Sequence, residues 1–344
     1  METKVAIFPS HGLGDSLIQL ALANNLARNG CRVTYYSDHM HVLRRYVSAG
    51  IEVRPQPVYQ QVLQELTDAE IVLYDTDAPF TVHLPPGLER WFANHGVCYS
   101  MTHGQPRHQW VTVTALRRRL MPAHRDQAEV WLRLNRSLRS RTFGFGSQPV
   151  VYQLATSVTA LLELKYKTYG NGLAVPRSTL PRHPDRVIIQ PTSGRPIKNW
   201  SPRYFVQLAY ALKVEGWQVA FSVAPTERKA WLRTPGACFE TPLFDSLEHV
   251  AHYYADSAAF IGNDSGCAHL ASCIGLPNLV IFRRWRRYPP WRPAWTPPRV
   301  VFPRTFDAKD WQQHLSVFRV HEVFRKMIAA SQEYARDDTA IPQA

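Results

Sequence analysis

The stretch FIGNDSGCAHLASCIGLPNLVIF at residues 260–282 decides the fold class. It contains the end of an apolar strand, expected over 258–264, then a turn at Ser265 and Gly266 and a helix to residue 275. A second apolar run, NLVIF at 278–282, follows almost at once. Strand, helix and strand at this spacing form a βαβ unit, whose two strands are parallel. The stretch therefore predicts an α/β protein with a parallel sheet.

The same alternation continues through most of the chain in both directions. In the second half we expect strands at 187–191 and 217–223, and helices at 202–216 and 246–257. In the first half we expect strands at 5–9, 31–37, 51–55 and 71–75, and helices at 16–30 and 41–50. Ser201 and Pro202 suit the start of a helix, and Gly30 and Gly216 suit helix ends. The pattern predicts parallel sheets covered by helices on both faces.

The length of 344 residues favours two domains rather than one core. A stretch rich in Pro and Gly at 169–186 is typical of a linker. We therefore expect an N-terminal domain over 1–175, a C-terminal domain over 186–320, and a helix with a tail over 321–344. The Arg-rich segment at 100–150 has too little periodicity for its elements to be assigned.

The composition indicates a globular protein with an excess of positive charge. Hydrophobic residues make up 45% of the chain, and 40 Lys and Arg against 27 Asp and Glu give a net charge of +13. Such a charge favours anionic partners. No apolar run approaches the roughly 20 residues of a spanning helix, the start does not resemble a signal peptide, and five scattered cysteines suit reduced thiols. We expect a cytoplasmic protein.

Three turns after predicted strands of the second half carry groups that suit a nucleotide diphosphate. The turn at 190–200 offers the hydroxyls of Thr192 and Ser193 and the ammonium of Lys198, and several short donors are what a diphosphate requires. An ordinary loop with a helix cap explains this turn equally well. Glu227, after the next strand, could accept from ribose hydroxyls, although a carboxylate in the first turn of a helix is favoured by the helix dipole alone.

The turn at 261–270 passes directly from a strand into a helix. Its first backbone N–H groups, those of Gly266, Cys267, Ala268 and His269, suit an anion. Asp264 could accept hydrogen bonds from sugar hydroxyls. Considered alone, however, it is better explained as the N-cap of the helix, with Ser265 completing the turn.

Taken together, these residues resemble glycosyltransferase family nine, the bacterial heptosyltransferases of the lipopolysaccharide inner core. The resemblance rests on PTSGRPIKNW, a Glu turn, FIGNDSGCAHLASCIGLPNLVIF and the opening KVAIFPSHGLGDSLIQLALANNLARNG. It covers residues 1–50 and 186–285 and is poor over 80–170. The chain departs from the family at Cys267 and Ala268, at GRPIK, and after NLVIF, where RRWRRYPPWRPAW replaces a Gly-Pro-Thr turn.

The resemblance implies a GT-B-like fold, with two Rossmann-like domains facing across a cleft. It implies inversion at the anomeric carbon without a metal or another cofactor, with a nucleotide diphosphate sugar such as ADP-heptose as donor. Asp15 matches the catalytic base and Lys198 the lysine at the diphosphate. The other positions that match the donor site are Thr192, Ser193, Glu227, Asp264, Ser265, Gly266, Cys267, Ala268 and His269.

The residues fit this chemistry without the family. An acceptor hydroxyl is a poor nucleophile, so a carboxylate must remove its proton as the new bond forms. Asp15 ends a glycine-bearing turn after the first strand, where it can serve as that base or only as a helix cap. His11, Gly12 and Gly14 in the same turn are candidates for acceptor contacts. Asp75 and Asp77 form the one D-x-D pair of the chain and are the alternative, metal-dependent hypothesis.

The segment at 282–295 interleaves five arginines with aromatic residues. Arginine with aromatics can bind single-stranded nucleic acid, but an anionic acceptor or membrane surface suits it better beside a sugar-transfer site. Its prolines argue against an amphipathic helix. We assign Arg286 and Arg287 as candidate contacts to the acceptor.

Three other functions compete with sugar transfer. A dinucleotide-dependent oxidoreductase is disfavoured by Leu17 at the third glycine position and by Asp15 facing a pyrophosphate. A nucleic-acid-binding protein leaves the NDSG and PTS motifs unexplained, and a non-catalytic nucleotide-binding protein leaves Asp15 unexplained. The expected partners are a nucleotide sugar, an anionic glycan or lipid-linked acceptor, and the inner-membrane surface as a peripheral contact. No nucleic acid is expected.

Overall fold

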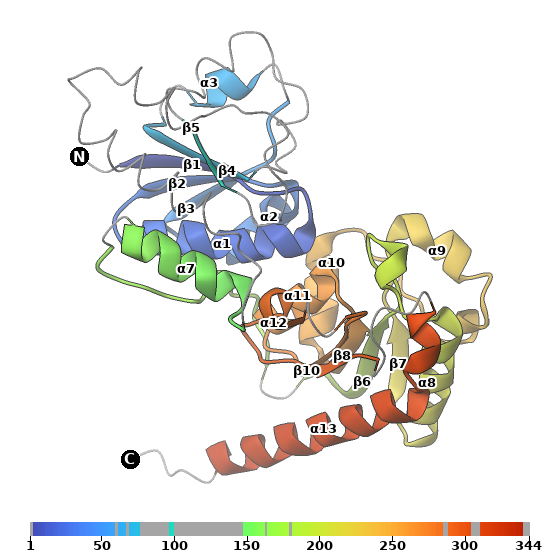
Figure 1. The fold of residues 1–344 in the computed structure, drawn as a ribbon. Helices are drawn as coiled ribbons and strands as arrows, with labels where there is room; N and C mark the ends of the chain where they lie inside the picture. Colours follow the sequence, from blue (N-terminus) through green and yellow to red (C-terminus); the bar gives the residue numbers. More distant parts are fainter. Residues whose placement is uncertain are drawn as a thin grey trace. The chain divides into compact units, whose positions relative to one another are not determined.

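The computed structural model divides into two compact units, Met1–Ala174 and Val175–Ala344 (Figure 1). It describes residues 3–58, 61–66, 69–75, 96–99, 147–161, 164–178, 181–284, 288–303 and 310–339. Each unit is built around its own parallel sheet with helices against it, and the predicted α/β class is confirmed.

The first unit contains a five-stranded sheet in the order β3-β2-β1-β4-β5. Its strands are β1 (Lys4–Phe8), β2 (Arg32–Tyr36), β3 (Ile51–Arg54), β4 (Ile71–Asp75) and β5 (Gly96–Tyr99). All of their pairings are parallel, and Phe8 at the end of β1 lies opposite Tyr74 of β4. Since the chain moves from β1 toward β3 on one side and toward β5 on the other, the switch point of this sheet lies between β1 and β4.

Helix α1 (Leu13–Arg28) is buried along most of its length, from Ser16 to Leu26. The sequence predicts a narrower apolar stripe, because polar residues such as Gln19 and Asn25 interrupt the pattern. Gly30 follows the helix with φ of 84°, as expected for a helix end. The helix predicted over 41–50 is wrong: the structure has α2 (Asp38–Val42) and a 3₁₀ turn, η1 (Arg44–Tyr46), because Ser37 caps an earlier start.

Helix α7 (Val150–Leu161) packs along α1. After it, the chain at 164–173 runs antiparallel to α1 and is fastened to it by asparagine side chains. Asn25 donates to Thr168 O (2.8 Å) and accepts from Thr168 N (2.9 Å), and Asn29 pairs with Tyr166 in the same way. We call residues 164–173 the strap. A short helix, α3 (Val62–Leu66), completes the named elements of this unit.

The second sheet has the order β10-β9-β8-β6-β7, again with parallel pairings. Its strands are β6 (His183–Gln190), β7 (Gln218–Phe221), β8 (Ser257–Asn263), β9 (Asn278–Ile281) and β10 (Arg299–Val301). Strand β6 begins at His183, so the last residues of the predicted linker belong to this sheet instead. The switch point lies between β6 and β8.

The helices of the second unit include those predicted over 202–216, 246–257 and 265–275. The described helices are α8 (Pro202–Val214), α9 (Pro225–Trp231), α10 (Leu247–Ala255), α11 (Gly266–Cys273), α12 (Tyr288–Trp291) and α13 (Val317–Thr339), with 3₁₀ turns η5 (Pro196–Lys198), η6 (Pro235–Cys238) and η7 (Trp311–His314), and the predicted ones are α8, α10 and α11. The fully buried Trp200 and Trp311 belong to the core between the sheet, α8 and α13. Helix α13 contributes Val320 and Phe324 to that core.

Within the described part of the chain, no helix has both the length and the apolar character needed to cross a membrane.

Candidate functional site

The candidate donor residues of the second unit gather at the switch point of its sheet. Thr192 and Ser193 follow β6, and Asp264 and Ser265 follow β8, the neighbouring strand. The carboxyl ends of parallel strands on either side of a switch point form the place where open α/β sheets bind their ligands. Residues that the sequence separates by about 70 positions are therefore brought to one edge of one sheet.

Lys198 and Asp264 form an ion pair at this edge. Lys198 Nζ lies 2.6 Å from Asp264 Oδ2, and the two side chains are 34% and 18% exposed. Lys198 is held on η5, whose first residue, Pro196, fixes the backbone of the turn. The pair places one cation and one hydrogen-bond acceptor side by side at a surface that a ligand can reach.

Thr192 and Glu227 form a second contact. The Thr192 hydroxyl donates to Glu227 Oε2 at 2.7 Å, and the backbone N–H of Ala224 donates to the same oxygen at 3.3 Å. Glu227 lies in the first turn of α9, and by accepting from the N-cap residue Ala224 it also stabilises the start of that helix. Its position beside Thr192 links the turns after β6 and β7.

Asp264 is not the N-cap of α11. That position belongs to Ser265, whose side chain accepts from Ala268 N, while the Ser265 carbonyl accepts from His269 N. Of the four amides expected to face an anion, Ala268 and His269 are thus engaged. The amides of Gly266 and Cys267 make no hydrogen bond within the described residues, and these two are the available donors.

Buried amides that the sequence did not single out hold these turns together. Asn263 at the end of β8 donates to Pro191 O (2.9 Å) and accepts from Trp200 N (2.9 Å). Ser265 donates to Gln190 Oε1 at 2.5 Å. An Asn or Gln at the end of an otherwise apolar strand is the signal that could have identified them, because a buried amide requires partners.

His269 points away from solvent and is only 5% exposed. Burial, the largest cause, lowers the pKa of His269 to about 4, although Asp264 acts in the opposite direction. One ring nitrogen bonds the backbone of Trp291, and Nδ1 has no hydrogen-bond partner among the residues that the structure describes. Ser272, one turn later on α11, accepts from Trp295 N and Thr296 N. His269 and Ser272 therefore fasten the segment at 291–296 to α11.

The basic segment after β9 is described only in part. Arg283 and Arg284 are half-buried, whereas Arg286 and Arg287, the candidate acceptor contacts, lie outside the described residues. Despite its prolines, Tyr288–Trp291 forms the single turn α12, because prolines in a first helical turn remove only N–H groups that have no partner inside the helix.

In the first unit, Asp15 lies in the first turn of α1 at the switch-point edge of its sheet. The N-cap is Gly12, not Asp15, and Gly12 has no side chain to cap the helix. Asp15 Oδ2 lies so close to Gly12 that a Cβ there would be 2.7 Å from it. Glycine at this position therefore leaves room for the carboxylate. Asp15 is half-buried and has further contacts of its own.

Asp75 lies beside this turn and is fully buried. Its Oδ2 accepts from the Ser10 hydroxyl at 2.7 Å and from Gln19 Nε2 at 2.9 Å. The network continues through Ser16, which donates to Ser10 O and accepts from Ser37. We call Ser10, Ser16, Gln19, Ser37 and Asp75 the buried polar network. It connects the end of β4 to the turn that carries Asp15.

Tyr35 is buried next to this network, and its pKa depends on the charges around it. Its hydroxyl donates to Ser16 O at 2.7 Å. Burial raises the pKa of Tyr35 well above the ordinary value, and the carboxylates of Asp15 and Asp75 raise it further. Two carboxylates therefore lie near one phenol at the start of α1.

His11, exposed in the same turn, faces His39 of α2, with ring centroids 6.2 Å apart. Burial, followed by the charge of His11, lowers the pKa of His39. His11 is thus reachable from solvent beside Asp15, together with the half-buried Gly12 and Gly14.

No group of three or more His, Cys, Asp or Glu side chains that could hold a metal ion occurs among the residues with described positions. Asp77 lies outside them, so the alternative Asp75–Asp77 pair is described only at Asp75, where Ser10 and Gln19 bind the carboxylate.

Comparisons with known proteins agree with this architecture. The model of glycosyltransferase family 9 (heptosyltransferase) matches residues 95–302. None of the curated proteins matches the sequence. A glycosyltransferase of family 9 from Veillonella parvula DSM 2008 is similar in structure, with 13% identity, 96% of this chain and 98% of that chain covered, and a TM-score of 0.65.

Two further similar structures come from E. coli. Heptosyltransferase WaaC with ADP-2-deoxy-2-fluoro heptose has 16% identity, coverage of 94% of this chain and 99% of WaaC, and a TM-score of 0.61. The iron-containing dodecameric glycosyltransferase TibC from strain H10407 has 14% identity, coverage of 96% and 77%, and a TM-score of 0.51. These likenesses confirm the GT-B-like fold class. Because the family model matches more than half of the sequence, the chain belongs to glycosyltransferase family 9, the heptosyltransferase family.

Proposed function

We propose that this glycosyltransferase moves a sugar from a nucleotide diphosphate to an acceptor hydroxyl, with inversion and without a metal ion. The observation that carries the proposal is the ion pair of Lys198 and Asp264 next to the Gly266 and Cys267 amides. A cation, two amide dipoles and a carboxylate at one switch point suit a diphosphate joined to a polyhydroxylated sugar.

In this proposal, the donor's diphosphate is bound by Lys198 and by the N–H groups at the start of α11. As the bond between the anomeric carbon and the diphosphate oxygen breaks, its electron pair goes to the diphosphate. Lys198 and the helix dipole stabilise the negative charge that develops there. Asp264, already beside Lys198, accepts hydrogen bonds from the sugar, and Glu227 accepts from the ribose hydroxyls.

Asp15 is proposed to remove the proton from the acceptor hydroxyl as that oxygen attacks the anomeric carbon. Two features support this assignment. Asp15 is not the N-cap residue of α1, and Gly12 leaves space beside its carboxylate. The hydrogen bonds of the buried polar network fix the turn that carries Asp15, so that the base is held in place before the acceptor binds.

For the donor we propose ADP-heptose, since WaaC, a similar structure, is described with an ADP-heptose analogue. For the acceptor we propose an anionic glycan of the lipopolysaccharide core or a related lipid-linked glycan, because the chain carries a net charge of +13. Arg286 and Arg287 are proposed to contact this acceptor. The protein is proposed to act in the cytoplasm, in peripheral contact with the inner membrane.

The decisive experiment is the Asp15→Asn substitution, assayed for turnover and for donor binding. A general base contributes about 10²–10⁴ in rate, so kcat should fall on that scale while ADP-heptose or ADP binds as before. Slow hydrolysis of the donor serves as the reaction until an acceptor is in hand. A variant that keeps its turnover, or that loses stability in proportion to its activity, would remove Asp15 from the role of base.

Metal independence has its own test. Turnover by the parent protein should survive incubation with EDTA, since Lys198 and helix amides, rather than an ion, are proposed to carry the leaving diphosphate. Loss of turnover that magnesium, manganese or iron restores would instead favour a metal-dependent reaction.

A further inference from the structure

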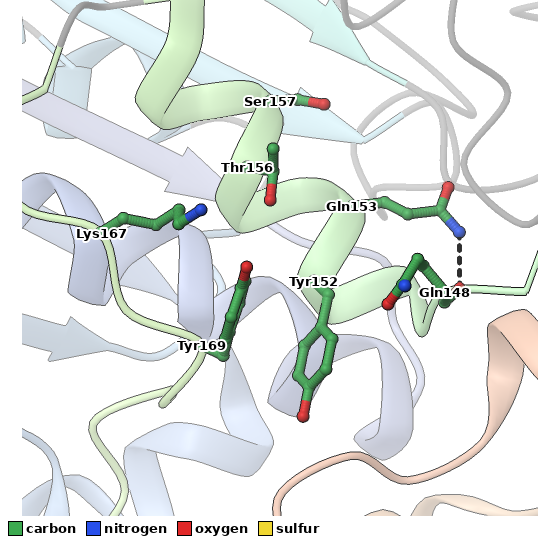
Figure 2. Close-up of a pocket in the computed structure, with 7 residues that line it drawn as sticks. All are labelled: Gln148, Tyr152, Gln153, Thr156, Ser157, Lys167 and Tyr169. Carbon is green, nitrogen blue, oxygen red and sulfur yellow. Dashed lines mark hydrogen bonds between the residues drawn. The ribbon is translucent and has the colours of Figure 1, made fainter.

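A cavity lies within the first unit, and the turn that carries Asp15 is not part of its lining. It has a volume of about 410 Å³ and is formed by the N-terminal half of α7 and the strap (Figure 2). Small-molecule sites in proteins commonly measure about 300–1,000 Å³, so the cavity has the size of such a site.

The walls of this cavity are firmly held. Asn25 binds both the N–H and the carbonyl of Thr168, between the two strap residues that line the cavity, Lys167 and Tyr169. On the other wall, Gln153 donates to Gln148 O at 2.7 Å. Because the strap is bonded to a buried helix, the cavity does not depend on a free loop.

Two tyrosines and a lysine form one end of the cavity. The rings of Tyr152 and Tyr169 lie with centroids 4.2 Å apart and planes at 30°. Lys167 Nζ lies 5.3 Å from the centroid of the Tyr169 ring, and Figure 2 shows Lys167 and Tyr169 both reaching toward Thr156 on α7. Hydrogen bonds from Lys167 and Thr156 lower the pKa of Tyr169. The cluster therefore combines an aromatic platform with a cation.

The remaining lining residues are amides and hydroxyls. Ser157 is only 3% exposed and has no hydrogen-bond partner among the described residues, although it lines the cavity. This hydroxyl can therefore bond with water or with a ligand in the cavity. No acidic side chain belongs to the described lining, and Lys167 is its charged member.

We propose that this cavity binds a saccharide unit that carries a phosphate or carboxylate group, as a subsite for the acceptor glycan. The apolar face of a sugar ring packs on tyrosine, its hydroxyls bond with Gln148, Thr156 and Ser157, and its anionic group pairs with Lys167. The assignment of the ligand to the acceptor rests on the proposed function.

The position of the cavity suits an extended acceptor. Asn25, which fixes the strap, is ten residues along α1 from Asp15, a separation of about 15 Å at the helical rise. A glycan of a few sugar units can span that distance, with one unit in the cavity and another at the reacting end.

The test measures binding in the full chain without any nucleotide sugar. Saturation-transfer NMR and titration would compare glucose 6-phosphate with glucose and with inorganic phosphate. Glucose 6-phosphate should bind saturably, and each of the two fragments at least about tenfold more weakly. Lys167→Gln and Tyr152→Ala should each weaken binding about tenfold, with thermal melting to verify that both variants fold.

Lys165→Gln is the matched control. Lys165 is also on the strap and also lies over a tyrosine ring, that of Tyr166, at 5.0 Å, but it does not line the cavity. This variant should bind glucose 6-phosphate as the parent does. Absence of saturable binding, equal binding of inorganic phosphate alone, or equal losses in Lys165→Gln and Lys167→Gln would each overturn the proposal. Donor binding and Asp15-dependent turnover are measured separately, so failure here leaves the proposed transfer reaction intact.

Discussion

The two switch points of this protein carry polar groups that differ in their exposure to solvent. In the first unit, Asp75 is fully buried and binds Ser10 and Gln19. In the second, Lys198 and Asp264 bind each other, but both keep a share of their surface in solvent. One set is enclosed by the protein, and the other remains within reach of a ligand.

This difference in burial separates polar groups that stabilise the fold from polar groups that can bind a ligand. A buried carboxylate must have hydrogen-bond partners at all times, because water cannot supply them, and so the buried polar network is fixed by folding. A partly exposed ion pair contributes little to stability and can exchange its partner for a ligand at low cost. We therefore expect substitutions in the first set to act mainly on stability and those in the second mainly on donor binding.

The largest effect is expected for Asp75→Ala. The substitution leaves the Ser10 hydroxyl and the Gln19 amide without a shared acceptor in a buried place and creates a cavity. The free energy of unfolding should fall by about 3–4 kcal/mol, measured by urea denaturation. The matched substitution Asp264→Ala removes the aspartate of the partly exposed pair and should cost under about 1 kcal/mol. Equal losses in both variants would abolish the distinction.

The next effect concerns pH and His269. The pKa of His269 is about 4 in the folded protein and about 6.5 in an unfolded chain, so the unfolded state binds more protons between these values. Stability from this group is complete above about pH 6.5 and is lost as the pH falls toward 4. The loss should be on the order of 2–3 kcal/mol.

Denaturation of the parent and of His269→Gln at several pH values would measure this term. The variant should depend less steeply on pH over that range, because glutamine does not titrate. Parallel curves for the two proteins would mean that His269 is not buried as described.

The smallest of the three effects is expected for Lys198→Ala, and it should appear in binding. Loss of a charge-assisted hydrogen bond should weaken the binding of ADP by about 1.5–3 kcal/mol, measured by calorimetry. The free energy of unfolding should change by less than about 1 kcal/mol, since the lysine is about one-third exposed. Unchanged affinity would remove Lys198 from the donor site. A loss of stability as large as that of Asp75→Ala would mean that Lys198, like Asp75, acts mainly on the stability of the fold.

Much of the fold could be predicted because its signals are local. The strands at β1, β4, β8 and β9 and the helices at α8, α10 and α11 were all expected from apolar runs and helix-start residues. The errors have local causes as well. Ser37 starts a helix earlier than the predicted one over 41–50, and His183–Gln190 extends a strand into a stretch whose prolines suggested a linker. Helix α7 begins where the unassigned Arg-rich segment at 100–150 ends, and no helix was predicted there.

The roles of the candidate site residues were harder to predict from the sequence than the fold. The alternative roles of each residue differ only in the contacts that its side chain makes. Asp15 and Asp264 each suited either an N-cap or a chemical role. The structure assigns the N-cap positions to Gly12 and Ser265 instead, and Asp264 pairs with Lys198. Asp75 suited a metal pair, and the structure shows it bound by Ser10 and Gln19.

The sequence by itself determined the alternation of strands and helices, the parallel sheets and the family resemblance. These follow from residue periodicity and from turn chemistry within a few positions. Only the tertiary structure decided which polar groups meet. Ser10 and Asp75 are 65 residues apart, and Lys198 and Asp264 are 66 apart. Each pair meets because its two strands are neighbours across a switch point, and that neighbourhood depends on the strand order, which no local pattern records.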